Sequence, residues 1–398
     1  MRRKPARGRK PAGAKRRRTS RSKSGGGSRS AGSRVRLKAA RIAIASVDRE
    51  LVRLVRRRLN LARQVGDVKR RAGIPIRDFA VEKEVLERVS RECVRLGVEP
   101  EVGQRMARLL IRASVQTQEE LFLPERGEAQ ILVVGGAGRM GRWLCDFLVS
   151  RGHRVEVCDP AKTRFPEAPL ERAADADFVI LATPISKTPE LLRRIIDLKP
   201  RGVVFDICSL KSPIELAIQR ARATGVRVCS IHPMFGPSAV LLSGRVVAIC
   251  DCGDKEAVKL ARSLFEGTAL RITEFPVAQH DRLMAYVLGL SHLVNLVTAR
   301  ALTLSGTEFK ELSGVASTTF RKMIATAAEV VNENPALYYE IQNLNPHSGE
   351  VASLLGTAVR EMEEASISER ANPEEFERLM LAAREYFGDA STGAGELE

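Results

Sequence analysis

Two cationic side chains lie on the apolar face of a long helix predicted over residues 35–71. Arg58 and Lys69 are 11 residues apart, which places them within about 20° of one another at 100° per residue. Val55 and Ala62 share this face, so the cations point toward an apolar interior, where a positive charge needs an anionic partner. The spacing therefore predicts a polar cavity for an anionic ligand inside a helical bundle.

Further polar pairs recur one helical turn apart on the next two predicted helices. Asp78 and Glu82 form one pair, and Ser114 and Gln118 form the other. Each pair is also typical of a solvated face or a helix cap. Together, and beside buried cations, they favour the wall of a polar cavity.

Arg41 lies too far along the first helix to share that cavity. It precedes Arg58 by 17 residues, which is about 25 Å along the axis and about 100° around it. Three helices in fewer than 90 residues also make a thin core, so we expect the unit to pair with a copy of itself. Arg41 is then placed to reach into the cavity of the partner.

In type and spacing these side chains resemble the active-site set of the all-helical chorismate mutases. The segments VGDVKRRAGIPIRDFAVEKEVLERV and SVQTQEEL are similar to that family too, and the resemblance covers about residues 35–122. It implies an intertwined dimer that rearranges chorismate to prephenate. The implied catalytic set is Arg41, Arg58, Lys69, Asp78, Glu82, Ser114 and Gln118.

The implied reaction suits these residue types. It is unimolecular, so restraint of the substrate and electrostatics supply the catalysis. The two arginines would hold two carboxylates by bidentate pairing. Lys69 and Gln118 would stabilise the negative charge that grows on the breaking ether oxygen. Asp78 and Glu82 would orient the substrate hydroxyl, and Ser114 would contact a carboxylate.

A glycine fingerprint follows the apolar strand predicted over 131–134 and opens a helix predicted over 139–150. Its glycines permit a tight turn, close approach of the backbone to a pyrophosphate, and close packing of helix on strand. The helix N-terminus adds free N–H groups and a positive dipole end. The predicted cofactor-binding set is Gly136, Gly138, Arg139, Met140, Gly141, Asp159 and Thr183.

Asp159 decides which cofactor we expect. It ends the strand predicted over 154–158, where an acidic residue usually holds the ribose 2′-hydroxyl of NAD. Lys162 and Arg164 lie close by in the sequence and leave NADP open.

Alternating strands and helices from residue 178 to 274, with one of the strands at 226–230, predict a parallel, doubly wound sheet, and one helix is predicted after it over 278–304. Thr183, Ser209, Lys211 and His232 each follow a predicted strand. Ligands of such sheets bind at the carboxyl ends of the strands, so these side chains are expected around the cofactor. His232, on a strand-end loop, is placed to take a proton, and Ser209 is its expected orienting partner.

The second half of the chain resembles the prephenate dehydrogenases over about residues 130–390. The segments that carry the resemblance are HPMFGP, DICSLKS, HDRLMAYVLGLSH and REYFG. It implies oxidative decarboxylation of prephenate to 4-hydroxyphenylpyruvate with NAD. His232 would accept the proton of the ring 4-hydroxyl, Ser209 would hold His232 and the cofactor edge, and His292 would contact the substrate.

One position departs from that family. The family commonly has an arginine that grips a prephenate carboxylate two helical turns beyond Arg321, and this chain has Glu329 there. Arg321 lies on the same predicted helix, eight residues and about 80° away, and is the candidate substitute for binding substrate. Three hypotheses therefore stay open: oxidation of prephenate, oxidation of arogenate, and a regulatory domain that senses tyrosine or prephenate.

The net charge of +17 is concentrated at the N-terminus. Residues 1–34 contain 14 Lys and Arg and no acid, so the rest of the chain carries only +3, which is ordinary for a soluble enzyme. A segment with so little apolar surface is expected to be disordered. A solvated tail is favoured over a nucleic-acid arm because no aromatic residues interleave the charges.

The seven cysteines, an odd number without a CxxC pair, predict a reduced, cytoplasmic protein without disulfides or a metal site. No uninterrupted apolar run approaches 18 residues, so no membrane span is expected. The N-terminus has no apolar segment of the secretory type. The expected partners are chorismate, prephenate and a second copy of the chain.

The predicted fold is multidomain. An all-α chorismate mutase-like unit precedes an α/β Rossmann domain with a doubly wound parallel sheet and an all-α C-terminal domain. The predicted boundaries are a disordered basic tail at 1–34, the mutase domain at 35–123, a linker at 124–129, the dinucleotide-binding domain at 130–275, the helical substrate and dimerisation domain at 276–390, and a polar tail at 391–398.

Overall fold

The computed structural model describes residues 26–72, 74, 76–119, 128–239, 242–369 and 371–388. Most of the predicted basic tail, most of the predicted linker and the whole predicted polar tail lie outside these residues. The chain divides into two units, Met1–Asn60 and Leu61–Glu398.

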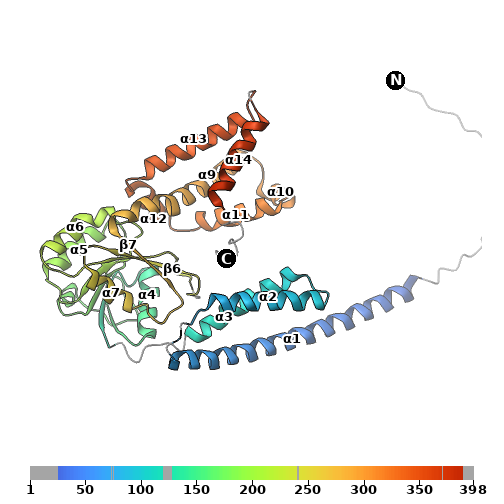
Figure 1. The fold of residues 1–398 in the computed structure, drawn as a ribbon, viewed down its shortest axis with the longest axis horizontal. Helices are drawn as coiled ribbons and strands as arrows, with labels where there is room; N and C mark the ends of the chain where they lie inside the picture. Colours follow the sequence, from blue (N-terminus) through green and yellow to red (C-terminus); the bar gives the residue numbers. More distant parts are fainter. Residues whose placement is uncertain are drawn as a thin grey trace, which may run out of the picture. The chain divides into compact units, whose positions relative to one another are not determined.

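The N-terminal part consists of the three predicted helices, α1 (Gly26–Ala72), α2 (Phe79–Arg95) and α3 (Pro100–Glu119) (Figure 1). α1 begins nine residues before the predicted position, because extending a formed helix costs little and no proline interrupts the segment. The Asp78 carboxylate caps α2 by accepting from the Ala80 and Val81 N–H groups. In the first unit, α1 exposes large apolar side chains such as Leu37, Ile44 and Leu51.

The first four strands form the predicted parallel sheet. They are β1 (Gln130–Val134), β2 (Arg154–Cys158), β3 (Phe178–Leu181) and β4 (Val203–Asp206), in the spatial order β2-β1-β3-β4. Each pairs in parallel with its neighbour. Because the carboxyl ends of all four strands lie at one edge, the loops that follow β1, β3 and β4 converge there.

The remaining strands correct one part of the prediction. β5 (Ser230–Pro233), β6 (Val246–Asp251) and β7 (Arg271–Pro276) form a second sheet in which β5 and β6 are antiparallel. The predicted strand 226–230 is reduced to one parallel bridge between Val204 and Val228. No helix is found among the described residues between β5 and β6, and a parallel connection needs a crossover of a dozen or more residues.

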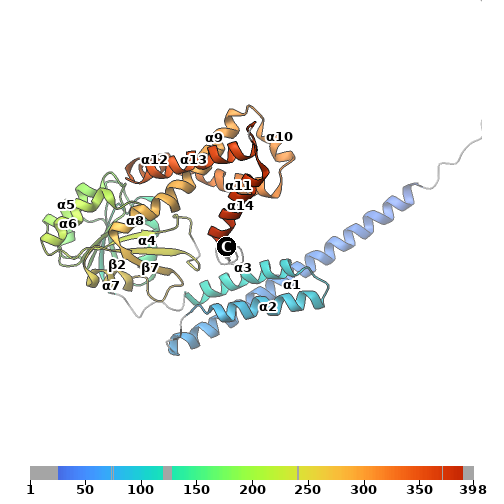
Figure 2. The same cartoon turned by 45° about the horizontal axis from the view of Figure 1, so that its top comes forward.

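Helices cover both faces of the first sheet (Figure 2). α4 (Arg139–Ser150) and α7 (Lys255–Ser263) share one core with the Ile131 and Val133 face of β1. α5 (Thr188–Asp197) and α6 (Glu215–Ala223) share the other core with the opposite face. The strands are therefore buried on both sides, as their continuous apolar patterns predict.

The C-terminal part is helical. Its elements are α8 (Val277–Met284), a π-helix (Ala285–Leu290), α9 (Ser291–Leu304), α10 (Phe309–Gly314), α11 (Thr318–Val331), α12 (Pro335–Leu344), α13 (Ser348–Ser366) and α14 (Pro373–Phe387). The stretch from α8 to α9 is predicted as one helix, and the structure inserts the π-helix within it. Such segments are rare and often occur at functional sites.

The stretch Val277–Leu304 is long and apolar enough to cross a membrane, judged by length and composition only. This corrects the expectation of no candidate span, which counted only uninterrupted apolar runs. Helices of soluble proteins pass the same test, so the finding is weak evidence for a span. None of the α9 residues is buried, and the side chains of Val294 and Val297 are exposed.

Candidate active sites

The glycine fingerprint forms the turn between β1 and α4. A Cβ atom on Gly136 would lie 2.6 Å from the Val157 side chain, and one on Gly141 would lie 2.2 Å from the Gly135 carbonyl oxygen. Any larger residue at either position would therefore displace β2 or the turn itself. Gly138, the N-cap of α4, makes no side-chain cap hydrogen bond, so it does not compete with a pyrophosphate for the N–H groups at the helix N-terminus.

Asp159 is held against this turn. Its carboxylate accepts from the Ala137 N–H at 3.0 Å and from the Ala161 N–H at 2.8 Å. A hollow of about 290 Å³ is lined by Ala137 of this turn and by Arg142 and Lys162, among other residues, but not by Asp159 itself. The turn and the carboxylate fit the pyrophosphate and ribose of a dinucleotide.

The other predicted cofactor residues differ in their contacts. Thr183 is half-buried, and its hydroxyl lies 2.8 Å from the Thr188 hydroxyl. Met140 is half-buried, and Arg139 is exposed. The Arg139 guanidinium pairs at 3.0 Å with Glu333, which lies between α11 and α12. This ion pair joins the cofactor turn to the C-terminal helices.

His232 is buried within β5, with an exposed fraction of 4%, and not on a strand-end loop as predicted. Its Nδ1 atom lies 3.0 Å from His280 Nε2, and His280 Nδ1 lies 2.6 Å from the Asp281 carboxylate. Burial above all, and then the nearby His280 and Lys211, lower the pKa of His232 well below its ordinary value. The imidazole is therefore neutral at pH 7 and able to accept a proton.

The predicted partnership of Ser209 with His232 is not found. Ser209 is half-buried, and within the described part of the chain the hydrogen-bonded partner of His232 is His280. His280 lies on the helix predicted over 278–304 and was expected there without a contact to His232. The adjacent His280–Asp281 pair, at the start of that helix, was the available signal.

Lys211 connects the segments next to His232 by hydrogen bonds. Its Nζ atom donates to the Asp206 carboxylate at 2.8 Å, to the Cys208 carbonyl at 2.7 Å and to the Ile231 carbonyl at 2.8 Å. Both partners of the ion pair are almost fully buried. These bonds tie the end of β4 to the strand that carries His232, so Lys211 is a structural residue.

His292 and Arg321 lie on the C-terminal helices. The His292 ring stacks on the Tyr338 ring with centroids 4.2 Å apart. Its Nδ1 atom is buried without a hydrogen-bond partner among the described residues, as suits a ligand contact. Arg321 is exposed and donates to the Ala316 carbonyl at 3.3 Å, and Glu329 is exposed on the same helix.

Five of the predicted mutase residues belong to the second unit. Lys69 Nζ donates to the Ile76 carbonyl at 2.6 Å. Gln118 is 7% exposed, and its Oε1 atom is buried with no hydrogen-bond partner in the part of the chain that the structure describes. A buried polar atom without a partner is costly, so this amide is suited to bind a ligand.

Three other residues of the predicted mutase set already form hydrogen bonds within the protein. Asp78 caps α2, and the Glu82 carboxylate accepts from Arg77 at 2.9 and 3.2 Å. Ser114 is buried and donates to the Leu110 carbonyl at 2.7 Å. The remaining residues, Arg41 and Arg58, lie on the part of α1 that belongs to the first unit.

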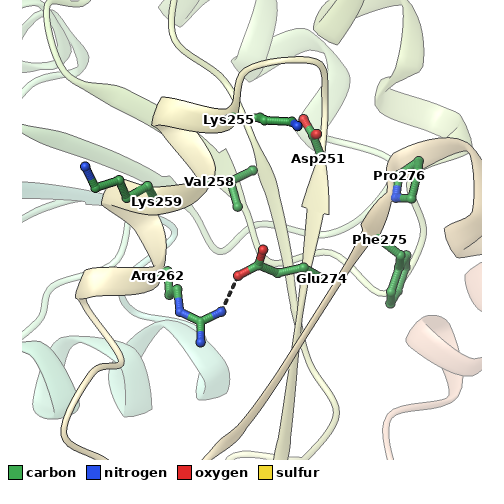
Figure 3. A pocket seen from close by; sticks show the side chains of 8 residues that line it. All are labelled: Asp251, Lys255, Val258, Lys259, Arg262, Glu274, Phe275 and Pro276. Carbon is green, nitrogen blue, oxygen red and sulfur yellow. Dashed lines mark hydrogen bonds and ion pairs between the residues drawn. The ribbon is translucent and has the colours of Figure 1, made fainter.

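A charged hollow of about 520 Å³ lies between α7 and the ends of β6 and β7. Figure 3 shows Lys255, Lys259 and Arg262 on one side, with Arg262 ion-paired to Glu274. None of the predicted site residues lines this hollow. Among the described residues no group of His, Cys, Asp or Glu is arranged to hold a metal.

Three protein-family models match the chain. They are "Chorismate mutase type II" over residues 40–119, "Prephenate dehydrogenase, nucleotide-binding domain" over 150–274, and "Prephenate dehydrogenase, dimerization domain" over 276–381. Each match falls on one of the predicted domains.

Known proteins resemble the same regions. A T-protein of Enterobacter agglomerans is 27% identical over 358 residues, which cover 89% of this chain and 93% of that protein. A 4-amino-4-deoxyprephenate dehydrogenase of Streptomyces pristinaespiralis is 30% identical and is covered to 91% of its length by 65% of this chain.

A solved structure shares the fold. It is the prephenate dehydrogenase from A. aeolicus in complex with hydroxyphenyl propionate and NAD+, which is 17% identical, with a TM-score of 0.54 over 66% of this chain and 99% of that one. Taken with the sequence matches, the chain belongs to the prephenate dehydrogenase family and carries a type II chorismate mutase domain in front of it.

Proposed function

We propose that the protein is a bifunctional enzyme of tyrosine biosynthesis. It rearranges chorismate to prephenate and then oxidatively decarboxylates prephenate to 4-hydroxyphenylpyruvate with NAD. The observation that carries this conclusion is that one chain combines the mutase domain with both dehydrogenase domains. T-proteins of Enterobacter agglomerans and Haemophilus influenzae match the chain across both parts.

In the mutase, side chains that hold the substrate and stabilise charge supply the catalysis. Lys69, whose Nζ atom donates to the Ile76 carbonyl in the structure, and the side-chain N–H of Gln118 stabilise the ether oxygen as its bond breaks. Arg58 holds one substrate carboxylate, and Arg41 of the second protomer holds the other. Glu82 and Asp78 orient the hydroxyl, with Glu82 exchanging its Arg77 contact for the substrate.

In the dehydrogenase, His232 accepts the proton of the ring hydroxyl while the C4–H bond is broken. Its neutral state in the folded protein makes it competent as a base. NAD, when bound, supplies the hydride acceptor. Asp159 and the glycine turn hold the dinucleotide, and the unpaired Nδ1 atom of His292 binds the substrate.

For the domains we propose the boundaries that were predicted from the sequence. The three family matches support these boundaries. We also propose a homodimer in the cytoplasm. The exposed apolar side chains of α9 form a surface that a second protomer would bury. They belong to the region that matches a dimerisation domain. All seven cysteines are free in the structure, as a reducing compartment requires.

A coupled assay tests the function. Purified protein receives chorismate and NAD, and loss of chorismate is followed together with the absorbance of NADH. We expect both to change. Chorismate loss with accumulating prephenate and no NADH, also with NADP or with arogenate as the substrate, would instead support a mutase with a regulatory Rossmann domain.

The exposed carboxylate at the end of α11 gives a test of substrate recognition. Because Glu329 stands where relatives commonly place an arginine, it repels a substrate carboxylate in our proposal. Glu329→Arg is expected to lower the KM for prephenate about 10-fold or more, since a hydrogen bond to a charged group contributes about 1.5–3 kcal/mol. Glu363→Arg on α13 introduces the same charge change and is the control.

Steady-state kinetics with prephenate and with arogenate distinguish the alternatives. An unchanged KM for prephenate in Glu329→Arg would remove Glu329 from the site. A KM that rises for arogenate alone would show that this carboxylate selects an amine-bearing substrate.

A further inference from the structure

His232 is the first of three buried side chains joined in a row. The row continues through the ring of His280 to the carboxylate of Asp281, over contacts of 3.0 and 2.6 Å. β5 supplies His232, and α8 supplies the other two. Their exposed fractions are 4%, 0% and 5%, so water does not compete for these contacts.

Asp281 is fixed at its end of the row. Its two carboxylate oxygens accept from the Lys211 and Ser212 N–H groups at 2.8 and 2.6 Å. Asn345 donates to its backbone carbonyl at 2.8 Å. Burial raises the pKa of Asp281, but hydrogen bonds from His280, Ser212 and Lys211 outweigh it and bring the pKa to about 2. Asp281 is therefore ionised at neutral pH and can only accept hydrogen bonds.

The protonation of both rings follows from that carboxylate. Because Asp281 accepts, His280 Nδ1 must carry the proton that it receives. The pKa of His280 is lowered, chiefly by burial, so the ring is neutral and its Nε2 atom is an acceptor. His232 Nδ1 must then be the donor in the contact between the rings.

We propose that His280 and Asp281 are positioning residues that hold His232 in the tautomer protonated at Nδ1, with Nε2 as the proton acceptor. This inference rests on the proposed role of His232. During the reaction the substrate O–H bond breaks and an N–H bond forms at Nε2. The oxygen's electron pair forms the C4 carbonyl as the C4–H bond breaks, and that bond's electron pair leaves with the hydride that NAD would accept. The resulting imidazolium stays paired, through His280, with the negative charge of Asp281.

The charged groups around His232 fix the direction of a pH effect. His280 and Asp281 face it from α8, and Lys211 faces it from the loop after β4. Of these, Asp281 raises the pKa of His232, while burial, His280 and Lys211 lower it. Removing the Asp281 charge therefore weakens His232 as a base, and the acidic limb of the rate profile moves to lower pH.

The tautomers can be observed directly because the chain has only five histidines. Protein labelled with ¹⁵N at histidine is expected to show the Nδ1–H form for His232 and His280 at neutral pH. In Asp281→Asn we expect a mixture of tautomers at both rings. An Nε2–H form of His232 in the unaltered protein would overturn the proposal, whatever the enzyme's activity.

Enzyme kinetics distinguish residues that position His232 from residues that only stabilise the fold. Asp281→Asn is expected to lower kcat with prephenate about 10- to 100-fold, with little change in the KM for NAD. His280→Leu should lose more activity than His280→Gln, whose amide oxygen can still accept from His232 Nδ1. His153→Gln, at the half-buried turn before β2, is the matched histidine control.

The outcomes are distinct. A lower kcat together with an acidic limb displaced to lower pH supports the proposal. An Asp281→Asn enzyme whose kcat and pH profile are unaltered contradicts the proposal. A lower kcat also contradicts it if NADH binding weakens by the same factor and the acidic limb of the pH profile does not move. If the unaltered protein forms no NADH from prephenate, the proposed function fails, while the tautomer measurement still decides the positioning.

Discussion

Replacing His232 with Asn is expected to lower the rate of NADH formation from prephenate by about 10²- to 10⁴-fold, the usual contribution of a positioned general base. The amide of Asn can keep the hydrogen bond to His280 that Nδ1 makes at 3.0 Å. It offers no basic atom at the position of Nε2. The variant therefore removes the proton acceptor while it preserves the buried contact behind it.

The bifunctional chain supplies an internal control for this variant. Chorismate consumption should stay at the level of the unaltered enzyme, and NADH binding, followed by fluorescence, should be retained. A His232→Asn enzyme that oxidises prephenate at an undiminished rate would remove His232 from the mechanism. A variant that also fails to bind NADH would report a disturbed β5, and His232→Gln would then be measured.

Lys69→Met should reduce kcat for chorismate about 10²- to 10³-fold. A preorganised donor to an oxygen that becomes negative in the transition state is worth about 3–4 kcal/mol. Lys69 Nζ lies in a partly buried setting near the carbonyl of Ile76, where its charge is less screened than at the surface. Methionine keeps the length and apolar body of the side chain and removes only the charge and its donors.

Two measurements keep this prediction specific. Lys83→Met, at an exposed position of α2, makes the same substitution where no substrate is expected, and its mutase activity should be unchanged. Prephenate supplied directly should still be oxidised by the Lys69 variant. Equal mutase rates for the Lys69 and Lys83 variants would exclude Lys69 from the catalytic set.

The cofactor turn could be predicted from sequence because its requirements are local. Gly136 and Gly141 sit where any Cβ would meet β2 or the turn, so the glycines themselves mark the geometry. The three N-terminal helices were predictable for a similar reason. Their caps and breaks, such as Asp78 and Gly97, act over a few residues.

Other features depend on contacts between distant segments. The direction of β5 depends on its pairing with β6, for example between His232 and Ala248, and the pattern of either strand alone contains no such information. The contact of His232 with His280 spans 48 positions. Ser209 was the nearer candidate in sequence, and only the packing of α8 shows that another side chain takes its place.

The last two turns of α3 belong to both halves of the molecule. Gln118 and Ser114 belong to the proposed mutase site, while Val115 and Glu119 on the same helix contact Ala269 in the region that matches the dehydrogenase. The Glu119 carboxylate accepts from the Ala269 N–H at 2.5 Å. The halves are thus joined by a stiff element as well as by a linker. Separating the two parts of the chain would therefore remove the partners of Val115 and Glu119 at the end of α3.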